Sequence, residues 1–375
     1  MKRLGLLGAA TLLAAAVGCG KPAMEKPAAD SAAAGPKPER PAPEDAADGT
    51  PVFSLAWSEY PSWSVFGVAH ERGLVDKAEG KIGPVEKQWG VDIVLVQADY
   101  DTCLGQYANS TVDAVCMTNM DSLAPATGRD SVAVLPTSTS VGADACLAVG
   151  VGSLDELKGV ATFGLEKSVS QYAFERCLEV AGEDPAEYEF RNMDPANAAL
   201  AMQTGDDAVK SIMVWNPFVL QTLRDQPDAK RMFDSSNIPE EIIDMVVVGK
   251  DALDKEGGAA FAHAVIDCFY RVNALLADRG QRAPTLKMLG EKFSSLSVED
   301  MEAVVQETRM YGDSGAGVAL FEKEDFRDGK MPAVVEFCLT HDIVTEEPTV
   351  GFDDADAQLN FDASYMKAVA AKSAE

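Results

Sequence analysis

Val112-Asp-Ala-Val-Cys-Met-Thr-Asn-Met-Asp-Ser122 is the stretch of sequence on which the interpretation of this chain depends. Its first half, 112–117, is short and mostly apolar, which is typical of a buried strand in a parallel sheet. Its second half is polar, and Asn119, Asp121 and Ser122 each carry an oxygen that can cap a new helix. Polar groups at the carboxyl end of a strand lie where open α/β sheets bind ligands. An ordinary strand-to-helix turn explains this stretch equally well.

The composition of the chain limits what it can bind. Its 375 residues include 60 Asp and Glu against 32 Lys and Arg, which gives a formal net charge of -28. No basic cluster is present, so nucleic acid is not an expected partner. None of the seven cysteines forms a Cys-x-x-Cys pair and the three histidines are scattered, so we expect neither a metal site nor a cofactor. Disulfide pairing among the cysteines stays open.

The N-terminal 50 residues differ from the rest of the chain. A basic start is followed by an apolar run that is too short to span a membrane comfortably, which indicates an export signal over 1–19. Ala16-Val17-Gly18-Cys19 resembles the lipobox of bacterial lipoproteins, which implies lipidation of Cys19, with a plain secreted protein as the alternative. Residues 20–50 are rich in Ala, Pro, Lys and Glu and are expected to form a disordered tether.

From residue 51 onward, strand and helix patterns alternate. Strands are expected at 52–57, 91–96, 112–117, 131–136, 143–149, 160–165, 211–215 and 242–248. Helices are expected at 63–72, 102–109, 170–181, 195–205 and 297–310, and the chain is expected to be mainly helical between 248 and about 282. This alternation favours an α/β fold with parallel sheets covered by helices on both faces. Two α/β lobes with a cleft between them explain the pattern most simply.

Several motifs resemble one family. Trp57-Ser58-Glu59-Tyr60, the segments 71–74 and 105–107, and Val112-Asp113-Ala114 look like the substrate-binding proteins of nitrate/taurine-type ABC transporters. The strings at 117–121, 168–172, 214–217 and 233–244 are similar to the urea-carboxylase-related branch of that family.

The resemblance implies a type II periplasmic-binding-protein fold, with two lobes joined by two hinge crossovers. One lobe would comprise 51–146 and 247–375, and the other 147–246. The implied role is that of a monomeric, exported, lipid-anchored protein, not an enzyme, that delivers a small nitrogenous solute to an ABC permease and its ATPase. Guanidine or urea is the solute that the branch suggests.

The residues expected to line the cleft are mostly aromatic, hydroxyl-bearing, amide or acidic, and Trp57, Asn119 and Trp215 are expected to converge there. Carboxylates beside aromatic rings suit a small cation. The predicted ligand-binding residues are Trp57, Ser58, Tyr60, Trp63, Thr118, Asn119, Asp121, Ser168, Ser170, Tyr172, Trp215, Asn216 and Asp244, with Glu59 beside them.

Each assignment has a structural alternative. Trp57 and Trp63 also suit a hydrophobic core, Asp121 and Ser168 suit helix caps, and Trp215 suits the simple end of a strand. Asp244 lies in an apolar strand, where a buried carboxylate needs either a ligand or a protein partner.

Other functions compete with solute transport of this kind. The rival ligands are a sulfonate or nitrate anion, which requires cationic donors or helix N-termini, and a thiamine-precursor pyrimidine. An amide or urea hydrolase using Asp121 and Asp244 is a more remote alternative, because no Gly-x-Ser-x-Gly elbow or phosphate loop is present. A scaffold lipoprotein that binds a protein partner is another.

Overall fold

The computed structural model describes residues 42–373. The expected export signal, Cys19 and residues 20–41 of the expected tether lie outside the described residues. The composition of 42–50 predicts part of a disordered tether, but residues 44–45 form a two-residue strand that pairs with residues 81–82. Glu44 and Asp45 there form ion pairs with Lys87 and Lys81, which gives this acidic segment a place against the folded body.

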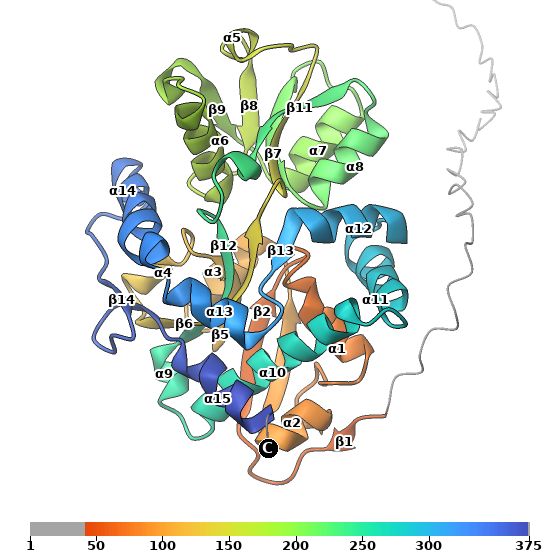
Figure 1. The fold of residues 1–375 in the computed structure, drawn as a ribbon, viewed down its shortest axis with the longest axis vertical. Coiled ribbons are helices and arrows are strands. Elements are labelled where there is room, and N and C mark those ends of the chain that lie inside the picture. The colour runs from red at the N-terminus through yellow and green to blue at the C-terminus, as the bar shows by residue number, and fades with distance from the viewer. Residues whose placement is uncertain (1–41, 374–375) are drawn as a thin grey trace, which may run out of the picture. The chain divides into compact units, whose positions relative to one another are not determined.

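Helices and strands alternate along most of the described chain (Figure 1). The helices are α1 Ser64–Glu71, α2 Pro84–Trp89, α3 Tyr100–Ala108, α4 Leu123–Ala126, α5 Leu154–Leu157, α6 Val169–Val180, α7 Pro195–Gln203, α8 Phe218–Asp225, α9 Lys250–Leu253, α10 Gly258–Ala277, α11 Arg282–Leu289, α12 Val298–Glu307, α13 Ser314–Phe321, α14 Met331–Thr340 and α15 Ser364–Ser373. The strands are β1 Glu44–Asp45, β2 Val52–Trp57, β3 Lys81–Ile82, β4 Asp92–Gln97, β5 Ala114–Thr118, β6 Ser131–Ser140, β7 Asp144–Val149, β8 Ala161–Gly164, β9 Glu189–Asn192, β10 Ser211–Trp215, β11 Ala229–Asp234, β12 Ile243–Gly249, β13 Thr308–Met310, β14 Val350–Phe352 and β15 Leu359–Phe361.

Two large sheets organise the described residues. The eight-stranded sheet has the order β14-β15-β6-β12-β5-β2-β4, with β13 also paired to β6, and the five-stranded sheet has the order β11-β7-β10-β8-β9. We propose that the two lobes coincide with these sheets. The chain would then pass between lobes at 141–143, after β6, and at 235–242, before β12.

The sheets are mixed, whereas the sequence pattern predicts parallel sheets. β2 pairs in parallel with β4 and β5, as expected, but β12 runs antiparallel to both β5 and β6. In the five-stranded sheet, β7 runs antiparallel to β10 and β11. β7 and β12 are the first strands after the chain passes from one sheet to the other. Neither strand follows a helix that crosses over its own sheet, which is the connection that makes neighbouring strands parallel. Their apolar runs resemble those of parallel strands because both faces of the sheets are covered.

Helices cover both faces of each sheet. β2 lies between β4 and β5, so the connections β2 to β4 and β4 to β5 cross the sheet in opposite directions. Right-handed connections then place their helices on opposite faces. Accordingly α1 and α2 pack with α10, whereas α3 packs against β2 and β5 (Figure 1). On the five-stranded sheet, α6 covers one face, and α7 and α8 cover the other.

The long helix α10 is apolar enough to cross a membrane by length and composition. Most of its side chains are buried in the fold, among them Phe261, Val265 and Phe269, and it packs against α1, α2 and α15. It therefore acts as a core helix in the structure.

Serine hydroxyl groups join the two segments that pass between the sheets. The Ser235 and Ser140 hydroxyl oxygens lie 2.6 Å apart. The Ser235 oxygen also accepts hydrogen bonds from the backbone N–H of Gly142 at 2.8 Å and of Asp144 at 3.4 Å. These side chains are buried, so polar contacts hold the two crossings together beside the apolar packing of Ala143, Ile238 and Ile242.

The Asn119 side chain links the end of β5 to the start of β12 through hydrogen bonds. Its side-chain oxygen accepts a hydrogen bond from the Ile243 N–H at 3.0 Å, and its amide N–H₂ donates to the Glu241 carbonyl at 3.1 Å. The Asn119 side chain is fully buried. Both ends of its amide are thus occupied by the backbone.

We expect Asn119→Ala to lower the free energy of unfolding by about 2–4 kcal/mol, because it leaves two backbone groups without partners. Urea denaturation monitored by circular dichroism measures this loss. Exposed Asn197→Ala is the matched control, with an expected change below about 0.5 kcal/mol. Equal losses in the two variants would contradict this structural role.

The six cysteines of the described residues, at 103, 116, 146, 177, 268 and 338, are all buried and free of disulfides. Within residues 42–373 no group of three or more His, Cys, Asp or Glu side chains is arranged to hold a metal ion. The thiols act as small apolar side chains in the core.

Candidate functional site

Two cross-strand pairs of residues build the candidate site, one from each sheet. In the eight-stranded sheet, Asp244 on β12 lies opposite Thr118 at the end of β5. In the five-stranded sheet, Asp144 at the start of β7 lies opposite Trp215 at the end of β10. All four side chains are more than nine-tenths buried, and all four line the same cavity. Each sheet therefore contributes one carboxyl group to a shared space.

Aromatic rings form the walls of this cavity. Tyr60 and Trp63 come from the turn after β2, and their ring centroids are 4.9 Å apart. Trp63 stacks on Tyr100, the first residue of α3, with the centroids 5.2 Å apart and the planes 17° from parallel. Tyr100 meets Trp215 edge to face at 5.9 Å. We call these four rings, with Asp144 and Asp244, the inner cage.

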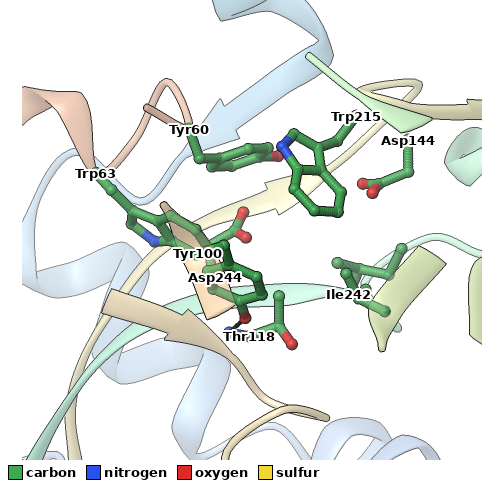
Figure 2. Close-up of a pocket in the computed structure, with 9 residues that line it drawn as sticks. Tyr60, Trp63, Tyr100, Thr118, Asp144, Trp215, Ile242 and Asp244 are labelled. Atoms are coloured by element: carbon green, nitrogen blue, oxygen red, sulfur yellow. Dashed lines mark hydrogen bonds between the residues drawn. The ribbon is translucent and has the colours of Figure 1, made fainter. Parts of the chain in front are cut away.

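The inner cage is small. Val169, Ile242 and Thr118 complete its lining, and no Lys, Arg or His is among the residues that line it. The space open to the centre of a water-sized sphere is about 10 Å³, which is room for about one water molecule. Figure 2 shows Tyr60, Trp215 and Asp144 on one side of this space, with Tyr100, Thr118 and Ile242 across from them. A ligand there must be very small or must widen the cage.

Burial controls the charge of the acidic groups. It raises the pKa of Asp144 to about 7 and, with Asp144 nearby, raises the pKa of Asp244 well above its ordinary value. The Ser138 hydroxyl donates a hydrogen bond of 2.5 Å to Asp244, which opposes this rise only in part. Because no cationic side chain lines the cage, an ionised carboxylate there lacks a counter-charge.

Two polar atoms in the cage walls have no hydrogen-bond partner among the described residues. They are the Tyr60 hydroxyl and the Trp63 ring N–H, on side chains that are 4% and 3% exposed. The Tyr60 hydroxyl lies near enough to Asp244 and Asp144 for both carboxyl groups to raise its pKa beyond the effect of burial. Unpartnered buried polar groups are costly, so these two atoms favour a polar ligand in the cage.

Asp121 lies behind the cage wall. Its carboxylate accepts hydrogen bonds from the Tyr100 hydroxyl at 2.7 Å and from the Thr118 hydroxyl at 2.9 Å. Burial raises its pKa to about 6, and the Val169 N–H at the start of α6 opposes this rise. Asp121 therefore positions Tyr100 and Thr118, and it is not among the residues that line the cage.

The expected convergence of Trp57, Asn119 and Trp215 is not found, because only Trp215 lines the cage. Trp57 ends β2 and lines a separate cavity beside Gly67. Asn119 is occupied by the backbone around Ile243, as described above. A one-residue step along a strand changes the face to which a side chain points, and the sequence pattern does not resolve that step.

The other predicted residues are buried but also lie outside the cage lining. The Ser168 hydroxyl caps α6 by accepting from the Ser170 N–H at 3.1 Å, and Tyr172 donates to Glu241 at 2.6 Å. Asn216 donates to Glu307 at 2.8 Å. Ser58 is buried, and the Ser170 hydroxyl is buried without a partner among the described residues. Of the thirteen predicted residues, the cage lining contains Tyr60, Trp63, Thr118, Trp215 and Asp244.

Tyr100 and Asp144 line the cage although the sequence pattern does not single them out. Asp144 is a carboxyl group at the start of an apolar strand, which is the same signal that singled out Asp244. Tyr100 follows the helix cap Asp99 at the start of α3, where aromatic residues are commonly core residues. Only the packing of Tyr100 against Trp63 and Trp215 reveals its place.

No protein family model matches the chain, and no curated protein matches it. Solved structures do resemble it. The aliphatic sulphonate binding protein SsuA from Escherichia coli matches with a TM-score of 0.60 and 17% identity, covering 79% of this chain and 89% of that protein. The alkanesulfonate-binding protein SsuA from Xanthomonas axonopodis pv. citri, bound to MOPS, matches with a TM-score of 0.62 and 15% identity, covering 80% and 96%. The nitrate-binding protein NrtA from Synechocystis PCC 6803 matches with a TM-score of 0.56 and 12% identity, covering 88% and 90%.

These similarities cover most of each protein, but the identities are low, so they establish the fold alone. The two mixed sheets joined by two crossings, with a cage between their strand ends, fit that conclusion. The chain has the α/β fold of the type II periplasmic binding proteins, of the kind seen in SsuA and NrtA.

Proposed function

We propose that this protein is an extracytoplasmic solute-binding protein that captures a small cationic nitrogenous solute, with guanidinium as the leading candidate. The observation that carries the proposal is the inner cage, in which four aromatic rings surround two carboxyl groups and no cationic side chain. A cation over a Trp or Tyr face gains about 0.5–2 kcal/mol. A planar guanidinium also pairs with a carboxylate through two parallel hydrogen bonds.

Urea is the neutral alternative, and one observation favours it. The Trp63 ring N–H has no acceptor among the described residues, and guanidinium has no acceptor to offer. The carbonyl oxygen of urea accepts a hydrogen bond, while its two N–H₂ groups donate to carboxyl oxygens as guanidinium does. Charge therefore separates the two ligands experimentally, because only guanidinium gains from ionised Asp144 and Asp244.

An anionic ligand is the competing proposal, and the printed names of the neighbours support it. SsuA and NrtA are named for sulfonate and nitrate. Here the start of α6 at Val169 lies in the lining, but its first N–H groups already have acceptors, since the Val169 N–H bonds Asp121 and the Ser170 N–H bonds the Ser168 hydroxyl. The two carboxyl groups of the cage oppose an anion, and no Lys or Arg offsets them.

The fold and the expected N-terminal segment support a proposal for the wider role of the protein. We propose that the protein acts as a monomer, is exported and lipid-anchored through Cys19, and delivers its solute to the permease and ATPase of an ABC importer. Closure of the two sheets around the solute would be a hinge motion at the two crossings.

Titration calorimetry at pH 8 tests the ligand class with guanidinium, urea, taurine and nitrate at millimolar concentrations and matched ionic strength. A four-atom ligand gains at most about 6 kcal/mol, so we expect a guanidinium Kd in the tens of micromolar. Tighter binding of taurine or nitrate would overturn the proposal. A broad thermal-shift screen in which no small solute changes the melting temperature would favour a scaffold role instead.

A further inference from the structure

The ring N–H of Trp63 separates the possible ligands of the inner cage. Trp63 lines the cage, its side chain is 3% exposed, and its N–H has no acceptor among the described residues. An indole N–H only donates, so it needs an acceptor atom. A buried donor without an acceptor is costly, and a ligand that supplies the acceptor removes that cost.

The other unpartnered group of the cage, the Tyr60 hydroxyl, does not discriminate between ligands in this way. A hydroxyl group both donates and accepts, so it can pair with an N–H of a solute as well as with an acceptor. It also lies near Asp244 and Asp144, whose ionised carboxyl groups accept hydrogen bonds. Tyr60 and the two carboxyl groups therefore suit the N–H groups of a solute, whereas Trp63 does not.

The second tryptophan of the cage differs from Trp63 in this respect. Trp215 also lines the cage, but its ring N–H donates a hydrogen bond to Glu59. The cage thus has one indole N–H with a protein acceptor and one without an acceptor among the described residues. This difference provides an internal comparison between two similar rings.

Neither of the simple ligands considered above suits every group of the cage. Guanidinium offers N–H donors to the carboxyl groups but no acceptor to Trp63, whereas urea offers an acceptor but no charge to ionised Asp144 and Asp244. A guanidinium that carries an oxygen atom on one of its nitrogens offers both. A hydroxyl group is the smallest such substituent, which matters in a cage with room for about one water molecule.

We propose that the solute of the inner cage is a cation of the N-hydroxyguanidine class, whose substituent oxygen accepts the hydrogen bond of the Trp63 ring N–H. Its guanidinium N–H groups pair with Asp144 and Asp244, as in the proposed function, on which this inference rests. Trp63 is then the residue that sets the preference for an oxygen-bearing guanidinium.

Titration calorimetry on the full chain at pH 7 tests the inference with guanidinium, N-hydroxyguanidinium and N-methylguanidinium. The hydroxyl and methyl substituents are similar in size, and only the hydroxyl offers an acceptor. We expect N-hydroxyguanidinium to bind about tenfold more tightly than N-methylguanidinium, because its oxygen gives the Trp63 N–H a partner. An affinity ratio near or below one, or no binding of N-hydroxyguanidinium where guanidinium binds, would overturn the inference and leave the proposed function standing. Absence of binding by all three cations would instead remove the proposed function.

Two variants locate the effect. Trp63→Phe and Trp215→Phe each replace an indole of the cage by a smaller ring, so both are expected to weaken the binding of both substituted ligands. Trp63→Phe also removes the donor without an acceptor, so the affinity ratio should fall below about twofold. Trp215→Phe removes a donor that Glu59 already accepts, so the ratio should stay at about tenfold. A ratio that persists in Trp63→Phe, or that is lost equally in both variants, would overturn the inference. The ratio in the parent protein decides the matter if Trp63→Phe does not fold.

Discussion

Asp144→Asn is expected to weaken guanidinium binding by about 30-fold or more. Removing one member of a buried charge pair costs about 2–5 kcal/mol, and each 1.4 kcal/mol is a factor of ten in Kd. Asp144 contributes one of the two carboxyl groups of the inner cage, and no other charged side chain there replaces it. Titration calorimetry at pH 8 measures the loss, and Asp244→Asn is expected to behave in the same way.

The same variant should be more stable than the parent protein without ligand at pH 8. Burial raises the pKa of Asp144 to about 7, so at pH 8 the native state holds an unfavourable buried charge that asparagine removes. Weaker binding together with a higher melting temperature would show that the variant has lost a ligand contact and not its fold. Urea should lose much less affinity than guanidinium, and equal losses for the two ligands would contradict the assignment of a cation. Exposed Asp228→Asn should change neither property.

The second large effect is a pH dependence of guanidinium affinity. Guanidinium stays charged across the accessible pH range, so the carboxyl groups alone set the dependence. With the pKa of Asp144 at about 7, about one part in a hundred of this group is ionised at pH 5. We therefore expect the Kd for guanidinium to rise about 100-fold between pH 8 and pH 5, and the Kd for urea to stay nearly constant.

The stability of the ligand-free protein should rise as the pH falls from 8 to 5, whereas the affinity for guanidinium should fall. A carboxyl group with a raised pKa contributes stability that is fully present below its ordinary pKa of 3.8 and is lost as the pH rises through its folded value. For Asp121 and Asp144 these values are about 6 and about 7. Thermal melts of the ligand-free protein between pH 5 and pH 8 measure this loss. A guanidinium affinity that is flat over the same range would exclude Asp144 as its charge partner.

Much of the fold follows from periodicity along the chain. The expected strands at 52–57 and 211–215 coincide with β2 and β10, and the expected helix at 170–181 differs from α6 by one residue at each end. The alternation of strands and helices predicts parallel sheets, and this prediction is wrong for β7 and β12, which run antiparallel to their neighbours. Direction depends on how the chain passes between two sheets, which a local pattern of apolar residues does not encode.

The candidate site was less predictable than the fold. Asp244 could be singled out because a carboxyl group in an apolar strand needs a reason to be there, and Asp144 carried the same signal. Trp57 and Asn119 could not be separated from the cage residues, because every residue of these turns has a chemically suitable side chain. What excludes them is tertiary: the Asn119 amide meets the backbone of Ile243, and the Trp57 ring lies in another cavity.

The serine-lined crossings have a consequence for how fast the molecule can change shape. A hydroxyl group rotates about its Cβ–Oγ bond and both donates and accepts, and Ser235 has three partners within 3.5 Å. When one sheet rotates against the other, the Ser235 hydroxyl can therefore replace one of these hydrogen bonds with another. The activation barrier for opening then does not include the cost of leaving a buried polar group without a hydrogen bond. The amide hydrogens of Gly142 and Asp144 would then exchange with deuterated solvent at the rate of that rotation, and a bound solute would slow both together.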